Sequence, residues 1–192
     1  ENAVHEEGFA AVCGVDEAGR GPLAGPVCAA AVILPRGLTI EGLNDSKKLT
    51  PRRREALFDV IESSAEAYGI AFASVEEIEA LNILGATYLA MNRAIAALGM
   101  DVDLALIDGN RSEGITYPCR TVVKGDARCA SIAAASVLAK VTRDRYMCEL
   151  DREYPGYGFA RHMGYGTAAH YAAIRELGPC PAHRPSFLRK MH

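Results

Sequence analysis

The sequence contains no tryptophan, no pair of cysteines at C-x-x-C spacing and no apolar run long enough to cross a bilayer. Its longest apolar run, residues 27–34, falls well short of the roughly 20 residues that a membrane-spanning helix needs. The spacing of the six cysteines argues against a zinc site, so we interpret them as free thiols in a reducing compartment. These absences predict a cytoplasmic protein without membrane contact.

The chain as a whole also has only a small excess of negative over positive charge. The 192 residues carry a formal net charge of −3, and 49% hydrophobic with 23% charged residues is typical of a globular protein with one main core. Such a net charge disfavours nucleic-acid binding, which depends on Lys and Arg. The basic residues nevertheless gather at 47–54, 124–128 and 140–145, which favours one basic face, although a charge run is usually only a solvated helix face.

What is present near the N-terminus is a hydrophobic strand that ends on two adjacent carboxylates, in the run VCGVDEAGRGPLAGP at 12–26. Asp16 and Glu17 repel each other and resist burial, so a fold keeps them there when a cation or a proton offsets their charge. Carboxylate oxygens are hard ligands, which favours Mg²⁺ or Mn²⁺. Glycines on both sides of Arg20 leave backbone amides that a substrate anion can reach. This stretch is therefore predicted to combine metal binding with anion contact.

The sequence pattern predicts consecutive strands at the start of the chain, followed by strands that alternate with helices. The expected strands are 11–16, 27–34, 68–73, 104–107 and 121–123; the expected helices are one from Pro51 to Ala65, a short one opened by a capping box at Ser74 and Glu77, a longer one stopped by Gly99, and one from 127 to about 146. This order predicts a mixed sheet with helices on its faces, and ligands in such sheets bind outside the strand ends.

Two further strands are followed by aspartates, Asp108 and Asp126. Each of them taken alone is as compatible with an ordinary turn residue. Neighbouring side chains of a strand face opposite ways, so we expect Asp16 and Glu17 to converge through a break in the strand, which Gly19 permits. Four converging carboxylates are able to hold two divalent ions roughly 3.5–4 Å apart, an arrangement that hydrolyses phosphodiesters.

Six ordered motifs span nearly the whole chain: GVDEAGRGPLAGPV at 14–27, GLNDSKKL at 42–49, LNILGAT at 81–87, LIDGN at 106–110, VVKGDARCASIAAASVLAKVTRD at 122–144 and HMGYGT at 162–167. Together they closely resemble the ribonuclease HII family, the type 2 ribonucleases H of bacteria. The resemblance implies an α/β protein with a ribonuclease H-like fold, in which a five-stranded mixed sheet is flanked by helices. It further implies a catalytic domain at 1–150 and a short helical C-terminal segment at 151–192 that contacts the substrate.

The resemblance also implies an endoribonuclease that cuts the RNA strand of RNA/DNA hybrids, and cuts 5′ to a single ribonucleotide in duplex DNA, leaving 3′-hydroxyl and 5′-phosphate ends. Asp16, Glu17, Asp108 and Asp126 match the family's metal-site acids, with Asp16 bridging two Mg²⁺ or Mn²⁺ ions. The matching substrate contacts are Gly19, Arg20 and Gly21 for the 2′-hydroxyl and the following phosphate, Tyr165 for the deoxyribose 3′ to the cut, and Asn44, Ser46 and Lys47 for backbone phosphate. No protein partner is evident, and we expect a monomer.

The chain departs from the family pattern at Met163, where relatives commonly carry a lysine, and this is expected to weaken phosphate contact without touching the metal site. His162 and His183 are interpreted as structural loop residues rather than catalytic ones. A clamp-binding tail of the sort that some family members carry is not evident after Phe187.

Two other functions stay open on the residues alone. A resolvase or integrase that cuts DNA would also need the acids, but it gives the glycine-flanked Arg20 and Tyr165 no clear purpose. A non-catalytic nucleic-acid-binding module should have lost one or more acids, and all four are present. Cleavage of an all-DNA duplex would indicate the first function, and absence of metal-dependent turnover would indicate the second.

Overall fold

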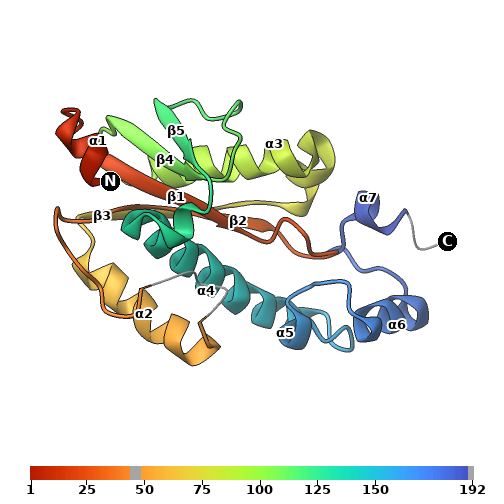
Figure 1. Ribbon diagram of the computed structural model, residues 1–192. Coiled ribbons are helices and arrows are strands. Elements are labelled where there is room, and N and C mark those ends of the chain that lie inside the picture. The colour runs from red at the N-terminus through yellow and green to blue at the C-terminus, as the bar shows by residue number, and fades with distance from the viewer. Residues whose placement is uncertain (44–48, 190–192) are drawn as a thin grey trace.

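A five-stranded mixed sheet with the strand order β3-β2-β1-β4-β5 forms the centre of the protein (Figure 1). The computed structural model describes residues 1–43 and 49–189. The strands are β1 (Val12–Ala18), β2 (Val27–Ile33), β3 (Ala67–Ala73), β4 (Leu104–Asp108) and β5 (Cys119–Val122). β1 pairs antiparallel with β2 and parallel with β4, so the central strand joins an antiparallel half to a parallel half. The predicted α/β class and mixed sheet are confirmed.

Helices cover both faces of this sheet. They are α1 (Asn2–Glu6), α2 (Pro51–Ser64), α3 (Val75–Ala96), α4 (Ala130–Glu153), α5 (Phe159–His162), α6 (Ala168–Leu177) and α7 (Pro185–Leu188), with a 3₁₀ turn η2 at Gly125–Ala127. In Figure 1, α3 lies over one face of the sheet, while α2 and α4 lie over the other. The short helices α5, α6 and α7 gather at the end of the molecule that holds the C-terminus.

The small residues of α4 let it approach the sheet closely. The helix presents a run of buried alanines and serines between Ser131 and Ala139 to β1 and β2. At Gly14 of β1, an added Cβ would lie 2.2 Å from the backbone nitrogen of Ile132, so glycine is required for this contact. α4 therefore runs directly beneath the strand that carries the paired acids.

Local signals in the sequence are confirmed at the starts of two helices. The side chain of Thr50 accepts a hydrogen bond from the N–H of Arg53 and caps α2. Ser74 and Glu77 form the expected capping box of α3. The predicted short and long helices are the two parts of α3, which meet at Asn82, where the backbone has a φ of 59°.

Other expectations about the elements need correction. β1 does not end at the acids, because it stays paired with β2 as far as Ala18. α4 begins at Ala130 rather than 127, because residues Gly125–Ala127 form η2 instead. α4 also continues to Glu153, so a helix runs through residue 150, and the division into 1–150 and 151–192 stays a prediction.

The C-terminal segment packs on the end of α4 and on the loop between β1 and β2. Leu23 and Ala24 of that loop share a buried cluster with Met147 of α4 and with Phe159 and Ile174. A backbone bridge joins the loop to the chain just before α7. None of the helices in the described ranges is long and apolar enough to span a membrane.

Candidate active site

The register of two parallel strands brings the first and third predicted acids together. β1 pairs with β4 so that Val15 lies opposite Ile107, and Asp16 and Asp108 are the residues that follow. Both side chains are on the face that packs against α4, because the residues two positions earlier on each strand contact that helix. Parallel register alone therefore places two carboxylates side by side.

Asp16 is almost completely buried, with 3% of its surface exposed. Its carboxylate accepts a hydrogen bond of 2.7 Å from the N–H of Glu17 and another from the hydroxyl of Ser136 on α4. Burial raises the pKa of Asp16 well above its usual value, and the charges of Glu17 and Asp108 raise it further. The site concentrates negative charge in a dry environment, a setting that a divalent cation stabilises.

A tight turn after β5 ties Asp108 to the segment of the fourth acid. Lys124 has a left-handed φ of 55° and precedes η2, and the N–H of Gly125 donates to Oδ1 of Asp108 at 2.7 Å. A Cβ at Gly125 would lie 2.6 Å from Ile132 and 3.1 Å from that oxygen, so glycine allows this approach. Asp126 follows directly and is 8% exposed. The turn thus brings the segment that carries Asp126 to the end of β4.

Glu17 lies on the opposite side of β1 from Asp16. It lines a cavity of about 200 Å³ together with Arg20 and Asp108, and its Oε1 is 3.3 Å from Nη1 of Arg20. The expectation of a strand break is wrong, because β1 remains regular through Ala18. The two adjacent acids flank the strand from its two faces, and Asp108 is the acid that neighbours both of them.

The acids fit a divalent-cation site by their donor chemistry, since carboxylate oxygens are the ligands that Mg²⁺ and Mn²⁺ prefer. Within residues 1–43 and 49–189, no three His, Cys, Asp or Glu side chains already stand at the spacing of a metal site. The structure brings Asp16 and Asp108 together, places Glu17 behind them and Asp126 on the adjoining turn. Their assignment as metal ligands stays a prediction.

The loop after β1 presents the glycine-flanked arginine at the surface. Gly19 is buried with a φ of 98°, and a Cβ there would lie 2.0 Å from Nε of Arg143. Arg20 and Gly21 are exposed. A Cβ at Gly21 would meet the ring of Tyr165 at an ordinary distance of 3.6 Å. The structure thus joins Tyr165 to the loop, although the two are far apart in the sequence.

Two buried arginines support this loop, and sequence reasoning missed both. Arg143 was expected on a basic face, but its side chain is fully buried, and so is that of Arg184. The burial of Arg143 could have been predicted from its spacing, because it lies four residues from both Ala139 and Met147 on the same buried helix face. Burial, reinforced by the charge of Arg143, lowers the pKa of Arg184 to about 9, so the guanidinium remains charged at neutral pH.

A chain of hydrogen bonds through two histidines reaches the backbone of Tyr165. Nδ1 of His183 accepts from the N–H of Cys180 at 3.0 Å, so its Nε2 carries the proton and donates to Nε2 of His170 at 3.1 Å. Nδ1 of His170 then donates to the carbonyl of Tyr165 at 2.9 Å. Burial lowers the pKa of both histidines, that of His183 to about 4. His162 likewise bonds to backbone atoms of Tyr157 and Gly164.

Three predicted phosphate contacts, Asn44, Ser46 and Lys47, lie outside the described residues. Met163 is described, and its carbonyl accepts a hydrogen bond from Nη1 of Arg143 at 3.0 Å. Its side chain packs against the C-terminal cluster. The effect of the missing lysine on phosphate contact stays a prediction.

A central mixed sheet whose strand ends bring acids together is the arrangement of the ribonuclease H-like fold. The crystal structure of the ribonuclease H2 from Pyrococcus horikoshii OT3 matches with a TM-score of 0.75 and 27% identity, covering 95% of this chain and 97% of that one. The model of the family described as ribonuclease HII matches residues 13–190, and the chain belongs to this family. It is a metal-dependent type 2 ribonuclease H that acts on RNA/DNA hybrids.

Curated relatives agree with this assignment, and a second solved structure shares the fold. The chain is 60% identical over 176 residues to the ribonuclease HII of Dechloromonas aromatica, covering 92% of this chain and 90% of the relative. It is 55% identical over 187 residues to that of Geobacter metallireducens, covering 97% and 88%. The crystal structure of Bst-RNase HIII in complex with Mn²⁺ shares the fold, with a TM-score of 0.69 and 20% identity over 92% of this chain and 65% of that one.

Proposed function

We propose that this enzyme cuts on the 5′ side of a single ribonucleotide in duplex DNA, as well as within hybrids, with two divalent ions per site. The observation that carries the proposal is that the cavity lined by Glu17, Arg20 and Asp108 adjoins the buried Asp16, while the ring of Tyr165 lies next to the same glycine-flanked loop. A general DNA nuclease needs the acids but has no use for a loop placed to read one sugar.

The acids would hold the metal. Asp16 would be the central ligand in this proposal, because it is the buried acid that neighbours both Glu17 and Asp108. Asp126 completes the set from η2. Two bound Mg²⁺ or Mn²⁺ ions would supply an activated water and charge stabilisation at the leaving oxygen. The chain's own contribution would be to bury Asp16 and to align it with Asp108 through the sheet.

The loop would recognise the ribonucleotide. The backbone of the segment Gly19–Gly21, which is exposed at Arg20 and Gly21, would contact the 2′-hydroxyl, the group that distinguishes RNA from DNA at a given sugar, and the phosphate that follows. The ring of Tyr165, next to Gly21, would pack on the sugar that follows the ribonucleotide, where a deoxyribose leaves room for it. Asn44, Ser46 and Lys47 would hold backbone phosphate, and one protein copy would suffice.

In the proposed reaction, water attacks the phosphorus and the bond to the 3′ oxygen of the preceding nucleotide breaks. That oxygen takes a proton and leaves as a 3′-hydroxyl, while the ribonucleotide keeps a 5′-phosphate. The neighbouring 2′-hydroxyl serves as a recognition group and not as the nucleophile. This route therefore differs from one that passes through a cyclic phosphate.

The test is incubation of the protein with a DNA duplex that contains one ribonucleotide, with Mg²⁺ or Mn²⁺ in separate reactions, followed by mapping of both product ends. We expect a 3′-hydroxyl on the DNA fragment and a 5′-phosphate on the ribonucleotide. A uniform hybrid and an all-DNA duplex are the matched substrates. A 2′,3′-cyclic phosphate or a cut 3′ to the ribonucleotide would overturn the mechanism, and cutting of the all-DNA duplex would favour a DNA nuclease.

A further inference from the structure

The guanidinium of Arg184 is fully buried beneath the loop that follows β1. Nη2 donates to the carbonyl of Gly19 at 2.6 Å, and Nη1 donates to that of Arg20 at 3.1 Å. The remaining hydrogen bonds go to the carbonyls of Pro22 and Gly25 at 2.7–2.9 Å. One side chain from the far end of the sequence thus holds the loop at its start, middle and end.

The positive charge of Arg184 strengthens its hydrogen bonds to the loop carbonyls. Among the residues that the structure describes, no carboxylate forms an ion pair with it, and its hydrogen bonds all end on backbone carbonyls. A buried cation deprived of acceptors is strongly destabilising, and hydrogen bonds to a charged donor exceed neutral ones in strength. The backbone of Arg184 is also fixed, because its N–H donates to the carbonyl of Leu23 at 2.8 Å. The loop carbonyls are therefore locked toward the interior.

Inward carbonyls determine where the loop amides point. The described peptide bonds are all trans, and in a trans peptide the carbonyl of one residue and the N–H of the next point in opposite directions. Because the carbonyls of Gly19 and Arg20 face Arg184, the N–H groups of Arg20 and Gly21 face away from it. Arg20 and Gly21 are the exposed residues of the motif, so these two donors face solvent. Successive outward amides form a concave site for an anion or a hydroxyl.

We infer that Arg184 is a positioning residue for ribonucleotide recognition: by holding the carbonyls of Gly19 and Arg20, it presents the amides of Arg20 and Gly21 to the substrate. The inference rests on the proposed function, because it gives the loop the role of reading the ribonucleotide. It assigns Arg184 no contact with the substrate, since the side chain lies entirely below the loop.

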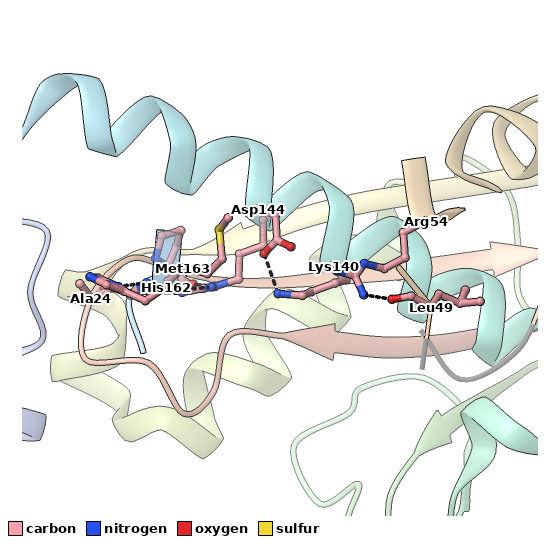
Figure 2. A network of polar contacts seen from close by, with 10 residues as sticks. Ala24, Leu49, Arg54, Lys140, Asp144, His162 and Met163 are labelled. Atoms are coloured by element: carbon pink, nitrogen blue, oxygen red, sulfur yellow. Dashed lines mark hydrogen bonds and ion pairs between the residues drawn. The ribbon is translucent and has the colours of Figure 1, made fainter. Parts of the chain in front are cut away.

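Arg143 offers a matched comparison within the same buried layer. Its guanidinium is equally buried, but it donates to the carbonyls of Ala24, Pro26 and Met163, none of which belongs to the glycine-flanked motif. Figure 2 shows Ala24 and Met163 close together at one end of this network. Arg143 therefore packs against Gly19 but donates no hydrogen bond to the motif, whereas Arg184 sets the peptide planes of the motif itself.

The test measures binding in a cleavage-deficient Asp16→Asn background, with a duplex containing one ribonucleotide and the identical all-DNA duplex as probes. A hydrogen bond to the 2′-hydroxyl should make the first bind about tenfold more tightly. Arg184→Lys, which keeps the charge but loses the planar fork, should bring this ratio to about one. Arg143→Lys should lower the melting temperature to a similar degree and keep the ratio.

Each outcome separates the inference from the proposed function. If Asp16→Asn alone shows no preference for the ribonucleotide, the proposed recognition fails. If the preference exists and Arg184→Lys retains it while folded, the positioning role of Arg184 is wrong. Equal loss of preference in both arginine variants would assign the loop geometry to general packing and overturn the specific role of Arg184.

If Arg184→Lys fails to fold, amide hydrogen exchange tests the inference without any arginine substitution. Amide hydrogen exchange in the Asp16→Asn protein should show fast exchange at Arg20 and Gly21, with protection on addition of the ribonucleotide duplex but not of the all-DNA duplex. Slow exchange of both amides in the free protein would show that they are not presented outward, and this would overturn the inference.

Discussion

The acids and the recognition loop lie next to each other, but the chain positions them by different means. Asp16 and Asp108 owe their proximity to the register of β1 and β4, in which each residue is held by a regular ladder of hydrogen bonds. The loop that carries Arg20 belongs to no such ladder and is held by two buried arginines from distant parts of the chain. In the proposed function, chemistry is therefore built on the sheet, and recognition depends on side chains beneath a loop.

This difference predicts different sensitivities. Changing an acid should remove catalysis while the fold persists, because the sheet does not depend on that charge. Changing Arg184 should affect stability and recognition together, because the same hydrogen bonds serve both, whereas changing Arg143 should affect stability alone.

Asp16→Asn should reduce the cleavage rate by about a thousandfold or more, equivalent to about 4 kcal/mol of transition-state stabilisation. The melting temperature without divalent metal should stay the same or rise, because the substitution removes a desolvated charge that Glu17 and Asp108 repel. Single-turnover cleavage and thermal unfolding measure the two effects. Near-normal cleavage at ordinary Mg²⁺ would contradict the role of the sheet-end acids.

Protonation of the buried histidines should destabilise the C-terminal support. Burial and the neighbouring His170 lower the pKa of His183 from 6.5 to about 4, so between these values the unfolded chain binds a proton that the folded chain does not. The contribution of His183 to stability is therefore complete above about pH 6.5 and is lost as the pH falls toward 4, by up to about 3 kcal/mol.

The measurement is the free energy of unfolding from pH 4 to 7 in the wild type and in His183→Gln. The variant should lose this part of the pH dependence, which separates it from the carboxylates that titrate in the same range. His5→Gln, on α1, controls for the loss of one histidine. Parallel profiles for the wild type and His183→Gln would show that His183 does not couple protonation to folding.

The two glycines of the loop should respond differently to the same substitution. Gly19→Ala forces a side chain into a backbone with a φ of 98° and against Arg143, and it should cost about 2 kcal/mol of stability along with most of the activity. Gly21→Ala meets Tyr165 at an ordinary contact distance, so stability should stay near that of the wild type while substrate binding weakens. Urea unfolding and steady-state kinetics compare the pair. Equal destabilisation would contradict the different supports described for the two positions.

Much of the sheet region could be predicted from the sequence because its signals are local. The apolar run before Asp16, the Pro51 helix start and the capping box at Ser74 depend on neighbours a few residues away, and each was confirmed. The set of acids also followed from strand ends. The expected strand break was wrong because β1 stays paired with β2 through Ala18. The parallel register of β1 and β4, a long-range property, brings Asp16 to Asp108 instead.

The supports of the loop could not be predicted in the same way. An arginine in a sequence is usually at the surface, and only the folded chain shows that Arg143 and Arg184 have backbone carbonyls as their acceptors. Ser136, which donates to Asp16, is one of two serines in α4 and carries no sequence signal of its own. Interactions between residues more than a hundred positions apart determine this part of the site.

Tyr165→Ala should give the smallest of these effects, because the ring is 44% exposed and adds contact area without supporting the loop. Loss of its packing on a substrate sugar should cost about 1 kcal/mol of transition-state binding. This corresponds to about a five- to tenfold lower kcat/KM on both single-ribonucleotide duplexes and hybrids. Tyr165→Phe keeps the ring and should retain most of the activity. Stability should barely change, since the tie between His170 and this residue uses its carbonyl and not its side chain. If Tyr165→Ala unfolded the protein as readily as Gly19→Ala, the ring would be part of the loop's support, and the contrast between the exposed reading surface and its buried supports would fail.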